Sequence, residues 1–149
     1  IRIPFKIDEE HKNRKAKESA SASIEGLRVL LVEDNELNME IARFIIENEG
    51  ARVTCATNGK EAVDIYKNAP ESFDIILMDI MMPEMDGYEA TRMIREMDLN
   101  IPIVAMTANA FMEDKIKAKK AGMNAHVSKP LDKDILIRVI SKLCGYKSV

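Results

Sequence analysis

Short apolar runs alternate with amphipathic segments along the chain from Leu27 onward. Runs with the length and composition of buried strands span Leu27–Val32, Arg52–Ala56, Phe73–Asp79, Ile101–Met106 and Asn124–Ser128. Predicted helices span Glu36–Glu49, Asn58–Asn68, Asp86–Met97, Phe111–Ala121 and Asp132–Leu143. Such alternation predicts an α/β fold with a five-stranded parallel sheet, five helices on its two faces and right-handed crossovers.

Local signals mark several of the predicted helix ends. Asn58 and Asp86 are each followed three residues later by Glu, which is a helix N-capping pattern. Gly50 and Gly122 follow two helices and are typical C-terminal stops.

The first 26 residues differ from the rest in composition. Ile1–Ile7 alternates apolar and polar residues, and Pro4 restricts it to an edge strand or a strand end. Asp8–Gly26 is charged and then rich in Ser and Ala, as linkers are. We predict that 1–8 is the end of an upstream domain, 9–26 a linker and 27–147 the folded domain. An added edge strand or a disordered tail is the alternative.

Polar side chains follow four of the five predicted strands. Glu33 and Asp34 follow the first strand, Asp79 ends the third, Thr107 follows the fourth and Lys129 the fifth. In a parallel sheet these residues emerge at one edge, where converging carboxylates require a cation. Oxygen ligands without His or Cys suit Mg²⁺, and a carboxylate beside a metal and an ammonium group can attack a phosphoryl group. Each residue alone could be an ordinary turn, cap or surface residue, but four such strand ends together favour a site.

Composition and charge limit which classes of protein the chain can belong to. Hydrophobic residues make up 46% and charged residues 32% of the 149, and the net charge is -3, which argues against a general nucleic-acid binder. No apolar run has membrane-spanning length, and Cys55 and Cys144 fit neither a metal motif nor a disulfide framework. We expect a cytoplasmic protein without nucleic-acid or membrane contacts, although its parent chain can be membrane-anchored.

Five motifs together resemble the receiver domain of two-component response regulators. They are VEDN at Val32–Asn35, NGKEA at Asn58–Ala62, LMDIMMPEMDG at Leu77–Gly87, MTANA at Met106–Ala110 and GMNAHVSKP at Gly122–Pro130. The resemblance implies a flavodoxin-like, doubly wound sheet with strand order 2-1-3-4-5, which is the strand order of that family.

The resemblance also implies roles for the acidic residues. Asp79 would accept a phosphoryl group from a phosphohistidine. Asp34, Asp79 and the backbone carbonyl of Met81 would hold Mg²⁺, with Mn²⁺ as a substitute, and Glu33 would complete the acidic pocket. Phosphatases of the haloacid dehalogenase type need a second Asp where this chain has Met81, which disfavours turnover of external substrates.

Three further residues take roles from the same resemblance. Lys129 would pair with the phosphoryl oxygens, and its bond to Pro130 would be cis. Thr107 would turn its hydroxyl toward the phosphoryl group, with the ring of His126 moving inward behind it. His126 stands where Tyr or Phe is commoner, and a passive strand residue is an equal alternative for it.

MTANA and SKP look most like receivers of hybrid sensor histidine kinases, and IRIPFKI resembles the last strand of a kinase ATP-binding domain. The implied partners are a kinase phosphohistidine domain or a histidine phosphotransfer protein. Whether the chain counts as an enzyme is left open, since a receiver promotes its own phosphorylation and dephosphorylation. An unphosphorylated docking module is the alternative function. The missing G-x-G-x-x-G after the first strand argues against a dinucleotide-binding module.

Two helices carry candidate partner surfaces. The first helix has more apolar positions than one core stripe needs: Leu37, Met39, Ile41, Phe44, Ile45 and Ile46. We expect one or two of them to be exposed for docking and most of the six to be buried, in a helix that packs more deeply than usual. The lysines of the fourth helix, at positions 115, 117, 119 and 120, are expected to form a solvated face, with partner contact as the alternative.

Overall fold

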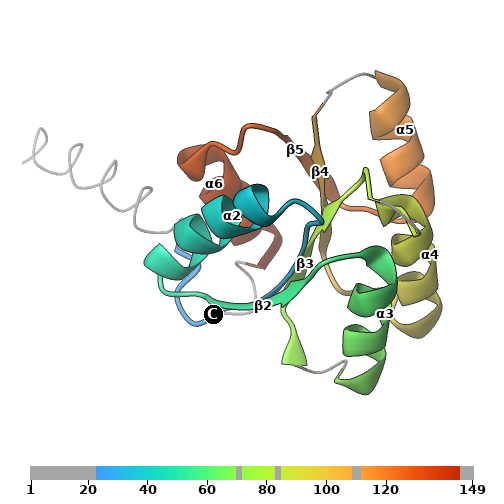
Figure 1. The fold of residues 1–149 in the computed structure, drawn as a ribbon, viewed down its shortest axis with the longest axis horizontal. Coiled ribbons are helices and arrows are strands. Elements are labelled where there is room, and N and C mark those ends of the chain that lie inside the picture. The colour runs from blue at the N-terminus through green and yellow to red at the C-terminus, as the bar shows by residue number, and fades with distance from the viewer. Residues whose placement is uncertain (1–22, 70–71, 83–84, 109–111, 145–149) are drawn as a thin grey trace, which may run out of the picture.

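The computed structural model describes residues 23–69, 72–82, 85–108 and 112–144. Its strands are β1 (Arg28–Val32), β2 (Arg52–Ala56), β3 (Ile75–Asp79), β4 (Ile103–Thr107) and β5 (Ala125–Ser128). Its helices are α2 (Glu36–Asn48), α3 (Gly59–Asn68), α4 (Gly87–Met97), α5 (Met112–Ala121) and α6 (Lys133–Cys144). The strands form one parallel sheet in the order β2-β1-β3-β4-β5 (Figure 1). The predicted fold and strand order are confirmed.

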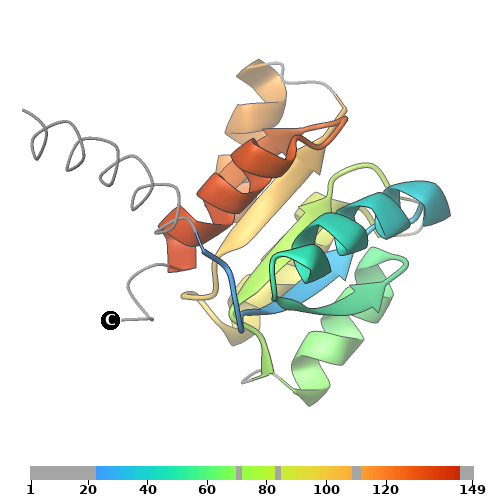
Figure 2. The same cartoon turned by 90° about the vertical axis from the view of Figure 1, so that its left-hand side faces the viewer.

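Helices cover both faces of the sheet. Figure 1 shows α2 and α6 on one side and α3, α4 and α5 on the other, and Figure 2 shows α2 and α6 from the front. Successive strand residues point to opposite faces, so Leu30 packs with the α3 and α4 side while Leu31 packs with the α2 and α6 side. Strands buried on both faces explain why the sequence shows nearly continuous apolar runs.

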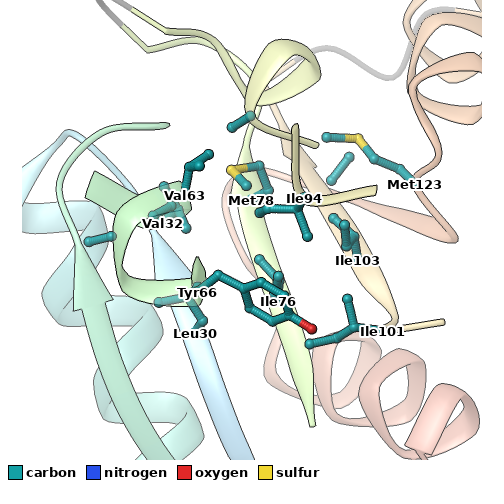
Figure 3. Close-up of a cluster of buried hydrophobic side chains, with 14 of the residues drawn as sticks. Leu30, Val32, Val63, Tyr66, Ile76, Met78, Ile94, Ile101, Ile103 and Met123 are labelled. Carbon is teal, nitrogen blue, oxygen red and sulfur yellow. The ribbon is translucent and has the colours of Figure 1, made fainter. Parts of the chain in front are cut away.

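The core on the α3 and α4 side is built around one aromatic residue. Tyr66 of α3 is fully buried beside Ile76 and Ile94 (Figure 3). Its ring stacks on that of Phe73, with centroids 6.3 Å apart. Its hydroxyl donates a hydrogen bond to the carboxylate of Asp98 at 2.6 Å, which satisfies the polar end of the buried side chain.

Helix ends follow the local sequence signals. The side-chain oxygens of Asn58 and Asp86 accept hydrogen bonds from the backbone N–H groups of Glu61 and Glu89, as predicted. Gly122 ends α5 with φ +107°, a conformation that residues with a Cβ adopt at a cost.

The start of the folded part differs from the sequence interpretation. Ile24, which falls in the predicted linker, is fully buried in the core beside α2 and α6. The packed domain therefore includes residues before Leu27. Residues 1–22, which hold the predicted upstream segment and most of the linker, lie outside the described residues, as do Phe111 and residues 145–147.

Candidate functional site

The ends of β1 and β3 bring three carboxylates together. Val32 lies opposite Met78 in the register of these neighbouring strands, so the residues that follow each of them are also neighbours. Carboxylate oxygens of Glu33, Asp34 and Asp79 lie within 4.8 Å of one another. Glu33 and Asp79 are buried, whereas Asp34 is exposed. The predicted convergence at the carboxyl edge of the sheet is therefore present.

Lys129 provides the positive charge of this site. Its Nζ lies 2.7 Å from Oε2 of Glu33 and 3.3 Å from Oδ2 of Asp79. Its backbone N–H donates a hydrogen bond to the Thr107 carbonyl at 2.7 Å, and the Lys129–Pro130 peptide bond is cis, as predicted. Burial lowers the pKa of Lys129, but the hydrogen bond that its Nζ donates to Glu33 and the charges of both carboxylates outweigh this effect and raise the pKa. Lys129 is thus held charged against the acidic pair.

Asp79 has an unusual protonation equilibrium. Its burial and the neighbouring charge of Glu33 raise its pKa to about 7, although the charge of Lys129 acts in the opposite direction. Without a further cation, burial and the charge of Glu33 thus favour the protonated form of Asp79 relative to an exposed aspartate. A cation bound between the carboxylates would favour the ionised form.

The backbone after β3 folds back over the site. The N–H of Met81 donates to Oδ1 of Asp79 at 3.3 Å, and the N–H of Gly87 donates to the Ile80 carbonyl at 3.0 Å. A Cβ at Gly87 would collide with the carbonyl of Asp79. The close approach of α4 to β3 therefore requires glycine at this position.

Thr107 and His126 lie on the neighbouring strands β4 and β5. Thr107 is the last residue of β4, where the sequence placed it just after the strand, and it is buried. His126 lies in the middle of β5, opposite Ala105, and is half-buried. The movement of this pair on phosphorylation stays a prediction.

Two features near the site were missed or only partly predicted. A pocket of about 80 Å³ beside Glu33 and Lys129 is completed by Asn38, Ile41, Pro130 and Leu131. Three apolar side chains of α2 are exposed, namely Leu37, Ile41 and Phe44 at 66%, 45% and 60%. The sequence showed an apolar excess on this helix, but its spacing could not tell the outward residues from Met39 and Ile46, which are buried.

The family of the chain follows from its sequence. A sequence profile of the response regulator receiver domain matches residues 29–141. The chain belongs to the family of response regulator receiver domains. Among the described residues, no helix is long and apolar enough to cross a membrane.

One relative and two solved structures place the chain within this family. The hybrid signal transduction histidine kinase I of Dictyostelium discoideum is 40% identical over 127 residues, covering 80% of this chain and 7% of that protein. The chain spans 17% or less of the length of the other curated relatives compared. These relatives are mostly histidine kinases.

The first structure is the receiver domain of sensor histidine kinase PA1611 from Pseudomonas aeruginosa, with a magnesium ion coordinated in its active site cleft. It is 38% identical with a TM-score of 0.75, covering 80% of this chain and 98% of that one. The second is the receiver domain of Ssk1 from Saccharomyces cerevisiae in complex with the histidine phosphotransfer protein Ypd1. It is 29% identical with a TM-score of 0.77, covering 84% of this chain and 93% of that one.

Proposed function

We propose that Asp79 accepts a phosphoryl group from a phosphohistidine in a Mg²⁺-dependent step and thereby relays or switches a two-component signal. One observation carries the proposal: a buried carboxylate at the carboxyl edge of the sheet lies among two further carboxylates and a lysine ammonium group. The resemblance to receivers of histidine kinases supports the same reading.

The donor set fits a hard divalent cation. Three carboxylates within 4.8 Å of one another, without His or Cys, are the ligands that Mg²⁺ prefers. Asp34, Asp79 and the backbone carbonyl of Met81 would hold the ion, with Glu33 completing the pocket, and Mn²⁺ would substitute for it. When bound, Mg²⁺ supplies charge stabilisation for the phosphoryl oxygens.

The side chains themselves account for the transfer. An ionised oxygen of Asp79 forms a new O–P bond while the P–N bond of the phosphohistidine breaks, and the imidazole nitrogen keeps the electron pair of that bond. Lys129, 3.3 Å from Asp79, pairs with the phosphoryl oxygens. Thr107 would donate a hydrogen bond from its hydroxyl to the new phosphoryl group, and the ring of His126 would move inward behind it. The product is an aspartyl phosphate.

The exposed face of α2 is the proposed docking surface for the donor. Leu37, Ile41 and Phe44 recur at helical spacing and present an apolar stripe beside the site. Such a stripe suits the helical bundle that carries a phosphohistidine, either in a histidine kinase or in a histidine phosphotransfer protein. The Ssk1 receiver, which resembles this chain, is in complex with a protein of the second kind.

The chain is further proposed to be part of a longer hybrid histidine kinase. On this reading, residues 1–8 end the ATP-binding domain, and the segment from residue 9 up to Ile24, which packs in the receiver core, connects the two. The relatives support this assignment because they are mostly histidine kinases of which the matching region is a small part.

The first test is intact mass after incubation with Mg²⁺ and acetyl phosphate. We expect one phosphoryl adduct, absent from Asp79→Asn and absent when the metal is chelated. A folded protein that gains no adduct from acetyl phosphate or from a phosphorylated histidine protein would refute phosphoacceptance and favour the docking module.

A second pair of variants tests the docking surface. Phe44→Asp should slow transfer from a phosphorylated histidine protein but leave adduct formation from acetyl phosphate unchanged. Leu99→Asp is the matched control, since Leu99 is also an exposed apolar residue, at 80%, but follows α4 at the opposite edge of the sheet. Equal effects of the two variants would refute docking through α2.

A further inference from the structure

The loop that follows β3 passes close to the start of α3. Gly59, the first residue of α3, is buried there. A Cβ at Gly59 would lie 2.5 Å from the carbonyl oxygen of Met85 and 3.1 Å from Cγ of Met85 and from Cβ of Ala90. Non-bonded Cβ atoms do not approach a backbone oxygen within 3.0 Å. The contact between α3 and this loop therefore has room only for glycine.

The helix itself does not require glycine at this position. The φ of Gly59 lies outside the left-handed region that favours glycine. Alanine forms helices better than glycine. The start of α3 is already defined by Asn58, whose side-chain oxygen accepts a hydrogen bond from the backbone N–H of Glu61 at 2.7 Å. Glycine is thus explained by the contact with the loop and not by the local structure of α3.

The loop begins at Asp79 and is held near both of its ends. The N–H of Met81 donates to Oδ1 of Asp79 at 3.3 Å, and the N–H of Gly87 donates to the carbonyl of the residue after Asp79 at 3.0 Å. A methyl group at Gly59 would have to push the carbonyl oxygen of Met85 from 2.5 Å to at least 3.0 Å. Because Gly87 holds the far end, this shift must be taken up in the rest of the loop, which includes Met81.

We propose that Gly59 is a positioning residue for the Mg²⁺ site. By letting the Met85 carbonyl lie against α3, it keeps the loop where the carbonyl of Met81 can hold the ion together with Asp34 and Asp79. Mg²⁺ demands nearly ideal octahedral geometry, so a small displacement of one ligand weakens its binding. Gly59 has no side chain that could bind the ion and acts only through the loop. The inference rests on the proposed function, which supplies these ligands.

The test is isothermal titration calorimetry of the chain with Mg²⁺ alone, compared with Gly59→Ala. We expect the affinity for Mg²⁺ to fall about tenfold, as it does when other groups that orient metal ligands are changed. Tyr66→Phe is the matched control, because it removes a hydrogen bond from the same helix about two turns away from the loop. Its thermal midpoint should fall, while its Mg²⁺ affinity stays within about twofold of the original.

A second variant relieves part of the crowding. In Gly59→Ala/Ala90→Gly, the Cβ of α4 that lies 3.1 Å from the added methyl group is removed. Helix α3 can then shift toward α4 and carry the methyl group away from the Met85 carbonyl. The Mg²⁺ affinity of this double variant should lie between those of Gly59→Ala and the original chain. Circular dichroism checks that each variant is folded.

Two outcomes would overturn this inference alone, namely an unchanged Mg²⁺ affinity in a folded Gly59→Ala and an equal loss of affinity in Tyr66→Phe. If Gly59→Ala does not fold, full Mg²⁺ affinity in the double variant would overturn it as well. An original chain that binds no Mg²⁺ would instead refute the metal site of the proposed function, and the inference would fall with it.

Discussion

Replacing Asp79 with Asn should stabilise the chain in the absence of divalent cations. Asn keeps the size of the side chain but removes a charge that is buried beside Glu33. Lys129 remains paired with Glu33 at 2.7 Å, so the substitution leaves no cation without a partner.

The magnitude follows from the pKa of Asp79, which is raised from 3.8 to about 7. An acid with a raised pKa in the folded state destabilises the fold once it ionises, and the full shift corresponds to about 4 kcal/mol. Rearrangement of the Glu33 carboxylate around the ionised Asp79 relieves part of this cost, so we expect a gain of about 2 kcal/mol at pH 8.

The raised pKa of Asp79 also determines how the stability gain of Asp79→Asn changes with pH. Below about pH 4 Asp79 is protonated in both the folded and the unfolded chain, so the substitution does not raise the free energy of unfolding. Between about pH 4 and 7 only the unfolded chain releases the proton, so the gain grows with pH and then levels off. At pH 5 it should be about a third of its value at pH 8.

Urea unfolding followed by circular dichroism at pH 5 and pH 8, with a chelator present, measures both values. Asp64→Asn is the matched control, because it removes an exposed carboxylate of α3. Adding Mg²⁺ to about ten times its dissociation constant should stabilise the original chain by about 1.4 kcal/mol and Asp79→Asn much less. A gain that is absent at pH 8, or equal at the two pH values, would refute the reasoning.

Three further substitutions probe the structure around the site. Tyr66→Phe removes the 2.6 Å hydrogen bond to Asp98 and should cost about 1–2 kcal/mol in urea unfolding. Because this bond lowers the pKa of Asp98, the loss of unfolding free energy caused by Tyr66→Phe should become smaller only below about pH 4. Arg95→Met removes hydrogen bonds to the end of α5 and the start of β5 and should cost about 2–3 kcal/mol, and an unchanged thermal midpoint would contradict this. Gly87→Ala places a methyl group against the carbonyl of Asp79 and should slow adduct formation from acetyl phosphate, whereas an adduct gained at the original rate would show that the backbone tolerates a Cβ there.

Much of the fold could be predicted because its strands are buried on both faces and its helices begin at polar caps. Asn58 and Asp86 marked helix starts through local chemistry alone. The burial of Ile24 could not be predicted in this way, because it stands among Ser, Ala and charged residues without periodic apolar neighbours, and only the packing of α2 and α6 buries it.

The site could be predicted in outline for a topological reason. Parallel strands end at one edge, so the acidic residues at the ends of β1 and β3 had to meet. The contact between Lys129 and Glu33 joins residues 96 positions apart, and no local pattern specifies its 2.7 Å distance. The lysines of α5 were expected to form a solvated face, and all four are exposed.

Helix α5 buries few side chains in the core. Of the α5 side chains that the structure describes, only Ala118 and Ala121 are buried, and each contributes a single methyl group. Moving such a helix exposes little apolar surface, about 1 kcal/mol per methyl group. A phosphoryl group at Asp79 would therefore need to supply only a few kcal/mol to reposition α5. Because the exposed residues of α5 contribute little to the core, they can be substituted at little cost in stability. The same sheet can therefore carry an α5 surface of different charge.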